Sequence, residues 1–205
     1  LCGICVRTCD EIVGVAAIDF VQRGFDTTIG SAPGKQWIDS DCVSCGECVE
    51  RCPTGSLAFT GFETPEYEVT TTCTYCGCGC GIIFGVRDNK LVQANGDINN
   101  PASRGRLCVK GRYGFDYVDH PDRLTCPLIR RDDAPKQASA PPVRGDLRTQ
   151  FREATWEEAM NRAAVGFEEI HKTHGGNALA GFGSAKGSNE EAYLFQKLIR
   201  QGFGH

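Results

Sequence analysis

The sequence has little that would mark a membrane protein or a nucleic-acid-binding protein. No apolar run approaches the length that a transmembrane helix requires. The 26 acidic residues outnumber the 22 basic ones, and a net charge of −4 leaves no basic surface that would attract nucleic acid. The chain starts at Leu1, without an initiator methionine and inside a cysteine motif, so we expect the natural chain to extend upstream.

Cysteine, in contrast, is abundant, with 13 residues in a chain of 205. Most of the cysteines occur in tight clusters with two or three residues between them. A dispersed arrangement and an even number would be typical of a disulfide framework, which is the less favoured alternative. The observed pattern indicates metal thiolates in a reducing compartment.

Two cysteine runs near the start follow the pattern of bacterial two-cluster ferredoxins, in which the fourth cysteine of each run ligates the other cluster. The complete run, C-x2-C-x2-C-x3-C-P, contains Cys42, Cys45, Cys48, Cys52 and Pro53. The other run contains Cys2, Cys5 and Cys9, and its first cysteine is expected just upstream. One [4Fe-4S] cluster is therefore assigned to Cys9, Cys42, Cys45 and Cys48. The other is assigned to Cys2, Cys5, Cys52 and the upstream residue.

A third run, C-x2-C-x3-C, is followed by a distant fourth cysteine; its members are Cys73, Cys76, Cys80 and Cys108. Thiolates at this spacing can enclose a cubane cluster, whose potential depends on charge, solvent exposure and hydrogen bonds to the sulfurs. A zinc knuckle is the alternative, but it usually contains two closely spaced pairs. Cys78 could compete with Cys80, and Cys126 is interpreted as a small buried hydrophobic residue.

The intervening segments predict an α+β fold. β-branched and aromatic residues favour a hairpin of residues 13–20 with 25–29. Together with short cysteine-bearing helices, this hairpin would form a two-[4Fe-4S] ferredoxin-like domain over residues 1–65, stabilised by its clusters. A small β-rich [4Fe-4S] domain is expected over residues 66–127. Its strands are predicted at 67–71, 82–86 and 91–94, with the last two joined by a turn at Asp88-Asn89.

The remaining residues predict a linker and the beginning of an α/β domain. Residues 128–150 are irregular and contain Pro135, Pro141, Pro142 and an Arg144-Gly145-Asp146 triplet that we attribute to chance. In the domain over 151–205, a capping box of Thr155 and Glu158 begins a helix that ends at Gly175-Gly176. Its buried face is predicted to contain Trp156, Met160, Ala163, Phe167 and Ile170. A strand over 178–183, a glycine-rich loop and a helix from Ser188 to Gly202 are expected next.

These motifs, in this order, closely resemble the catalytic subunit of molybdenum- or tungsten-dependent formate dehydrogenases, and most of all the soluble NAD-coupled type. The likeness rests on the three cysteine groups and on Cys108-Val-Lys110-Gly-Arg-Tyr-Gly-Phe-Asp116. It extends through His120-Pro-Asp-Arg-Leu, Phe151-Arg-Glu-Ala-Thr-Trp and Gly183-Ser-Ala-Lys-Gly-Ser-Asn-Glu-Glu. The resemblance implies a parent enzyme that oxidises formate to CO2 at a molybdenum or tungsten bis(molybdopterin guanine dinucleotide) centre.

The resemblance also implies roles for particular residues. Lys110 would lie between the third cluster and the pterin and ease electron passage. Ser184, Asn189 and Glu190 are matched to positions around a guanine-dinucleotide arm. The cysteine or selenocysteine that ligates the metal is expected past His205, so no catalytic residue is assigned within this chain. Three [4Fe-4S] clusters would pass electrons to a flavin/NAD-reducing partner subunit in the cytoplasm.

Two other classes of protein remain open. One is an electron-transfer protein without metal catalysis, similar to the large iron–sulfur subunit of respiratory NADH dehydrogenases. The other is a zinc-stabilised interaction module.

Overall fold

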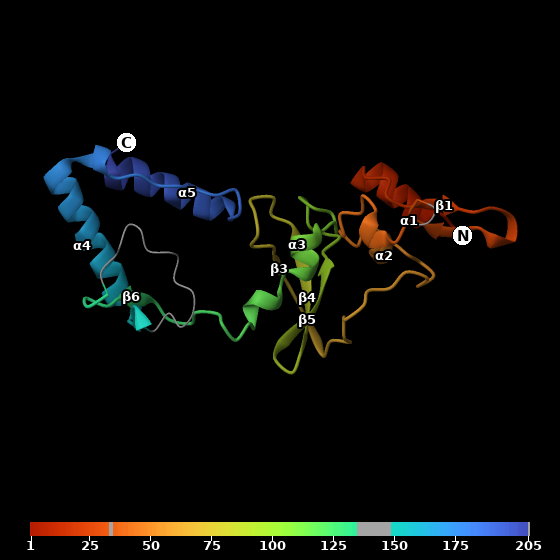
Figure 1. Cartoon of the computed structure of the whole chain (residues 1–205), viewed down its shortest axis with the longest axis horizontal. Helices are drawn as coiled ribbons and strands as arrows, with labels where there is room; N and C mark the ends of the chain where they lie inside the picture. The colour runs from red at the N-terminus through yellow and green to blue at the C-terminus, as the bar shows by residue number, and fades with distance from the viewer. Residues whose placement is uncertain (33–34, 135–148, 205) are drawn as a thin grey trace. The chain divides into compact units, whose positions relative to one another are not determined.

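A computed structural model describes residues 1–32, 35–134 and 149–204. The chain divides into two compact units, and Figure 1 labels most of their α-helices and strands. The first unit comprises Leu1–His120 and Ser184–Glu190. The second comprises Pro121–Gly183 and Glu191–His205.

The N-terminal part of the first unit consists of short elements that bear the first seven cysteines. The helix α1 (Ile4–Arg7) continues as the π-helix η1 (Thr8–Val13), while α2 (Glu47–Glu50) ends before Pro53. The strands β1 (Asp19–Val21) and β2 (Thr28–Gly30) pair antiparallel, with the 3-10 turns η2 (Gly24–Asp26) between them and η3 (Trp37–Asp39) after them. The predicted hairpin is confirmed but shorter, because Val13 belongs to η1 and Phe25 belongs to η2.

A three-stranded antiparallel sheet follows in the same unit, in the order β3 (Tyr67–Thr72), β4 (Gly81–Arg87) and β5 (Lys90–Gly96). Asp88 and Asn89 join β4 to β5 with φ values of 49° and 58°, the left-handed conformation expected of a two-residue turn. The three predicted strands are therefore confirmed. Beyond the sheet lie α3 (Val109–Tyr113) and the 3-10 turn η4 (Asp116–Val118). The buried core of this part consists of Cys73, Ile82, Ala94 and Leu107.

The second unit begins with a two-stranded ribbon of β6 (Leu128–Arg130) and β7 (Phe151–Glu153). The irregular linker expected from residue 128 is therefore wrong at its first residues. Ile129 is buried, and the Arg130 guanidinium lies 4.6 Å from the Phe151 ring centroid, which favours pairing of the two segments. Residues 135–148, including the prolines and the Arg144–Asp146 triplet, lie outside the described residues.

The helix α4 (Trp156–His174) begins and ends as predicted, but its apolar face is exposed. Thr155 Oγ1 accepts a hydrogen bond of 3.1 Å from the Glu158 N–H, while the Glu158 carboxylate pairs with Arg152 rather than closing the capping box. Trp156 and Met160 are 71% and 63% exposed. The spacing identifies the apolar side of a helix, but burial requires a second element along it. In the described part of the unit, Phe203 reaches this side beside Phe167.

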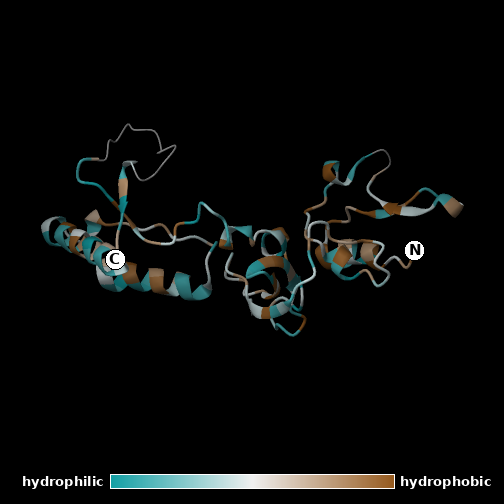
Figure 2. Ribbon diagram, turned by 90° about the horizontal axis from the view of Figure 1, so that it is seen from below, coloured by the Kyte–Doolittle hydropathy of each residue, from teal (hydrophilic) through white to brown (hydrophobic). Residues whose placement is uncertain are grey.

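The strand predicted over 178–183 is absent from the described structure. Residues Gly176–Ala178 form a 3-10 turn, η6, and no described strand pairs with the segment that follows, so its β-rich composition has no ladder to join. The next helix, α5 (Asn189–Lys197), continues as the π-helix η7 (Leu198–Phe203), one residue past the predicted end at Gly202. Figure 2 shows hydrophobic and hydrophilic residues interspersed along these helices. None of the helices in the described ranges has the length and apolar character needed to cross a membrane.

Candidate iron–sulfur sites

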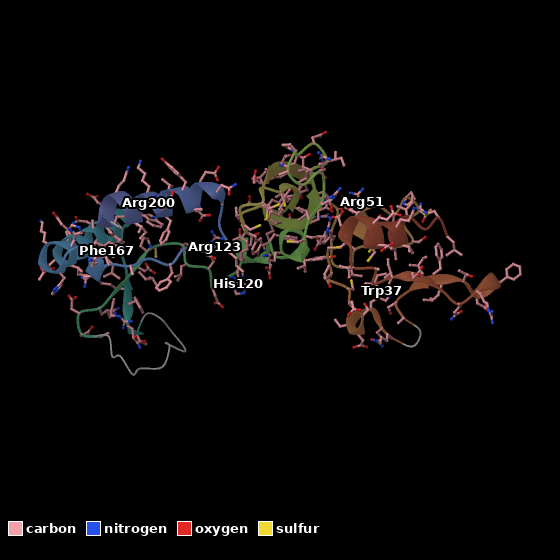
Figure 3. The ribbon with its side chains drawn as sticks, turned by 90° about the horizontal axis from the view of Figure 1, so that it is seen from above. Trp37, Arg51, His120, Arg123, Phe167 and Arg200 are labelled. Carbon is pink, nitrogen blue, oxygen red and sulfur yellow. The ribbon has the colours of Figure 1, made fainter. Side chains whose placement is uncertain are left out.

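Four cysteines from the two ferredoxin-like runs line one hollow of about 340 Å³ in the first unit. Cys9 comes from η1 and Cys48 from α2, so residues far apart in the sequence meet there. The walls are apolar and include Trp37, which is labelled in Figure 3. The members of this thiol set are Cys9, Cys42, Cys45 and Cys48. The structure thus brings together the crossed set assigned from the spacing.

The surroundings of this set suit a group that carries positive metal charge. The Ala17 N–H donates to Cys9 Sγ at 3.3 Å, and the Ser44 N–H donates to Cys42 Sγ at 3.4 Å. Burial, followed by the charges of the neighbouring thiols, raises the pKa of Cys48 to about 11. Bound iron would compensate the thiolates that burial disfavours, and N–H donors to sulfur are a means of tuning a cluster's potential.

A second hollow, of about 700 Å³, is lined by Cys2, Cys5 and Cys52. This is the other crossed set, without its upstream member. Here the pKa of Cys52 is lowered to about 7, chiefly because the Leu57 N–H and then the Thr54 hydroxyl hydrogen-bond to its sulfur. The Thr54 oxygen lies 3.6 Å from Cys52 Sγ. The loop after Pro53 therefore stabilises the thiolate that a metal needs.

The low pKa of Cys52 predicts its reactivity in the metal-free chain. The thiolate is the nucleophile, so at pH 7.5 Cys52 should react with iodoacetamide before the other cysteines, and its rate should level off as the pH rises past about 7. Thr54→Val should shift this profile to higher pH. Peptide mass spectrometry measures both, with half-buried Cys126 as the internal reference. Earlier labelling of Cys48 would contradict the prediction.

The third thiol set lies at one end of the three-stranded sheet. Cys73 follows β3, and its N–H donates to the carbonyl of Cys80, just before β4, at 2.8 Å. Burial raises the pKa of Cys73, an effect reinforced by Cys108 and Cys76 and opposed by Lys110. Burial, followed by a hydrogen bond from the Cys80 thiol to exposed Cys78, raises the pKa of Cys80 to about 12. Cys73 thus lies within electrostatic range of the three other predicted ligands.

A cluster and a single ion require different arrangements of the thiols. Zinc holds its thiolates about 2.3 Å from one point, whereas a cluster holds them at separate corners. In residues 1–32, 35–134 and 149–204, no three Cys, His, Asp or Glu side chains gather around one ion-sized position. All thirteen cysteines are free thiols.

The residues matched to the pterin region differ in where they lie. Lys110 is half-buried in α3, two residues after Cys108. The Asn189 side-chain amide donates to the Gly77 carbonyl at 3.0 Å, which ties it to the loop between Cys76 and Cys78. Ser184 Oγ accepts from the Lys186 N–H at 3.1 Å, and Glu190 is exposed. Of these residues, Lys110 and Asn189 are the ones placed beside the third thiol set.

Sequence reasoning missed three residues that connect the thiol sets. Arg112 is fully buried and forms ion pairs with Glu47 and Glu50 of α2. Nothing in the cysteine spacing indicates this contact. The one available signal is the placement of two acidic residues in the helix that carries Cys48, since buried carboxylates need a partner.

Comparison with known proteins divides the chain into three matched segments. Residues 1–56 match the family described as "4Fe-4S dicluster domain". Residues 66–120 match "Molybdopterin oxidoreductase Fe4S4 domain", and residues 123–205 match "Molybdopterin oxidoreductase". The order is thus a dicluster part, a further cluster domain and the start of a molybdopterin domain.

Three curated relatives illustrate the range of similar proteins. "NADPH-Fe(3+) oxidoreductase subunit alpha" of Geobacter sulfurreducens is 35% identical over all of this chain and 22% of its own length. An NADH-quinone oxidoreductase subunit of Rhizobium meliloti is 34% identical over 97% of this chain and 21% of its own length. A "Putative formate dehydrogenase" of Staphylococcus haemolyticus is 29% identical over 100% of this chain and 24% of its own length. The chain therefore spans about a quarter or less of each relative.

Proposed function

The chain belongs to the molybdopterin oxidoreductase family, and on that premise we propose that it carries electrons within the catalytic subunit of a formate dehydrogenase. In the proposed reaction, formate loses two electrons and one proton and becomes CO2 at a molybdenum or tungsten centre bound by molybdopterin guanine dinucleotide. The electrons then leave for a flavin/NAD-reducing partner subunit. The proposed setting is the reducing cytoplasm.

The observation that carries this proposal is the arrangement of three thiol sets along one unit. Eleven cysteines fall into these sets, and Lys110 lies two residues after the last cysteine of the third set. Iron–sulfur clusters bound in them would supply one-electron carriers. Lys110 would place its positive charge beside the electron path, as its effect on the pKa of Cys73 indicates. Asn189 would hold the loop around Gly77 in position toward the pterin side.

A second candidate is an electron-transfer subunit without its own metal catalysis. It is favoured by the similarity to the quinone-oxidoreductase protein of Rhizobium meliloti, whose identity of 34% exceeds the 29% of the formate dehydrogenase relative. Both candidates use the same three thiol sets. They differ in whether formate itself can deliver electrons.

The deciding experiment is formate reduction of the full-length protein, purified without oxygen and loaded with its cofactors. Three clusters predict about twelve irons per chain and a brown colour. Formate alone should bleach the visible absorbance and produce the electron paramagnetic resonance (EPR) signals of reduced clusters. Acetate is the matched carboxylate control and should produce neither.

Other results would contradict the proposal in different ways. A protein with twelve irons that dithionite reduces and formate does not would favour the electron-transfer subunit. A colourless protein, silent in EPR after dithionite, would remove both candidates.

A further inference from the structure

Arg112 is the fully buried charged side chain between two thiol sets of the first unit. It lies in α3, four residues after Cys108, and its side chain is 0% exposed. Its Nε donates to the Cys45 carbonyl at 2.8 Å. The Arg112 side chain thus extends from α3, the helix that follows the third thiol set, to the backbone of Cys45. Cys45 is a predicted ligand in the set of Cys9, Cys42, Cys45 and Cys48.

Both ion-pair partners of Arg112 lie in α2, around Cys48. Arg112 Nη2 is 3.1 Å from Glu47 Oε1, and Nη1 is 2.7 Å from Glu50 Oε2. Glu47 is itself 2% exposed and lies between Cys45 and Cys48. Because arginine stays charged and its donors are fixed in a planar fork, these contacts define an orientation as well as a distance.

A second contact crosses between the same two segments. The Leu107 N–H donates to Glu47 Oε1 at 3.1 Å, and Leu107 directly precedes Cys108. One carboxylate therefore binds residues on both sides of Cys108. Side-chain contacts of Glu47 and Arg112 therefore help to set the position of Cys108 relative to Cys45 and Cys48.

The sequence also leaves room for this arrangement at Gly46. Its φ of +75° is a left-handed conformation, and a Cβ added there would lie 2.8 Å from Arg112 Nε and 2.7 Å from the Phe59 ring. A side chain at this position would push the guanidinium away. The turn between Cys45 and Glu47 is thus shaped to admit Arg112.

We propose that Arg112 is a positioning residue that, through Glu47 and Glu50, holds the Cys73/Cys76/Cys80/Cys108 site against the Cys9/Cys42/Cys45/Cys48 site for electron transfer. This inference rests on the proposed function, because it requires clusters in both sites. The transfer moves one electron and no atoms: the third site is oxidised by one electron and the first is reduced by one. The electron comes from the formate oxidised by the parent enzyme.

Such a buried ion pair orients the two segments relative to each other rather than stabilising the fold. The desolvation of buried charges offsets most of their attraction, so the pair adds little net stability while it selects one arrangement. Packing between the two segments comes from aromatic rings. The ring centroids of Phe59 and Tyr113 are 6.1 Å apart, and those of Phe62 and Phe115 are 6.3 Å apart. These contacts would keep the segments together when Arg112 is replaced.

The test uses the full-length, cofactor-loaded protein and three variants. Arg112→Met removes the charge at similar length, and Arg112→Lys keeps the charge but loses the fork. Arg51→Met is the matched control, because Arg51 also contacts Glu47, at 3.4 Å, but from within the same segment and 30% exposed; it is labelled in Figure 3. The readouts are iron content, spin coupling between the reduced clusters in EPR, the rate of electron arrival by freeze-quench, and hydrogen exchange of the Leu107 amide.

We expect Arg112→Met to keep its iron, lose the spin coupling and slow the transfer at least about tenfold, because it leaves buried Glu47 without its main counter-charge. The Leu107 amide should exchange faster. Arg112→Lys should fall between wild type and Arg112→Met, and Arg51→Met should match wild type. Unchanged coupling and rate in Arg112→Met, or equal losses in Arg51→Met, would overturn the inference.

If Arg112→Met fails to load iron, the Glu50→Gln variant tests the same ion pair from its other side. Glu50 is 28% exposed, so losing its charge leaves the core intact. Weakened coupling at full iron content would support the inference, and wild-type coupling would reject it. A wild-type protein with fewer than three clusters would instead reject the proposed function.

Discussion

Replacing Cys9 with alanine is expected to remove the same EPR signal as replacing Cys48, although the two residues belong to different cysteine runs. Both thiols line the 340 Å³ hollow, and the pKa of Cys48 responds to the charge of Cys9. Losing one of four ligands should cost that site up to about four irons per chain. Cys5→Ala should remove a different signal, because Cys5 lines the other hollow.

The control for this prediction is Cys126→Ala, which should keep all its iron because Cys126 belongs to none of the thiol sets. Iron analysis and EPR of the dithionite-reduced, full-length protein distinguish these variants. If Cys9→Ala and Cys5→Ala lost the same signal, each run would ligate its own cluster and the crossed arrangement would be wrong.

Gly96→Ala should have the largest effect on stability among the glycine substitutions. A Cβ at Gly96 would overlap the carbonyl group of Gly105, which is backbone and has little freedom to move. Gly105 has a φ of +80° and belongs to the loop that returns from β5 to Cys108. Overpacking against a backbone atom is expected to lower the free energy of unfolding by about 3 kcal/mol or more.

Gly166→Ala is the matched control for that substitution. Gly166 lies inside α4, and apart from the adjacent helix backbone no atom lies within 4 Å of an added Cβ. Replacing a helix-interior glycine by alanine should raise stability by about 0.5–1 kcal/mol. Thermal unfolding followed by fluorescence measures both, and iron content shows whether Gly96→Ala also disturbs the site at Cys108. Equal midpoints for the two variants would contradict the steric argument.

Local chemistry explains why parts of the fold could be predicted from sequence. The turn at Asp88-Asn89 and the cap at Thr155 depend on a few neighbouring residues, and both are present. The grouping of Cys9 with the second run was also accessible, because the ferredoxin spacing encodes a crossed ligand set.

Features that depend on distant partners were not predictable in the same way. The exposed face around Trp156 has the spacing of a buried helix, but spacing does not say whether a partner covers it. The segment after Ala178 has a strand-like composition without a neighbouring strand in the described residues. The burial of Arg112 against Glu47 joins residues 65 positions apart, and no local pattern indicates it.

The near-complete burial of Glu47 has a practical consequence for dissecting this protein. Residues 107 and 112 supply two of the hydrogen-bond donors to its carboxylate, and both lie beyond the dicluster segment. An excised ferredoxin piece ending at residue 56 would keep Arg51 as a partner of Glu47 but would lose Arg112, which leaves more negative charge beside Cys45 and Cys48. Because added negative charge favours the oxidised form of a cluster, midpoint potentials measured on such a piece would be lower than those in the intact enzyme.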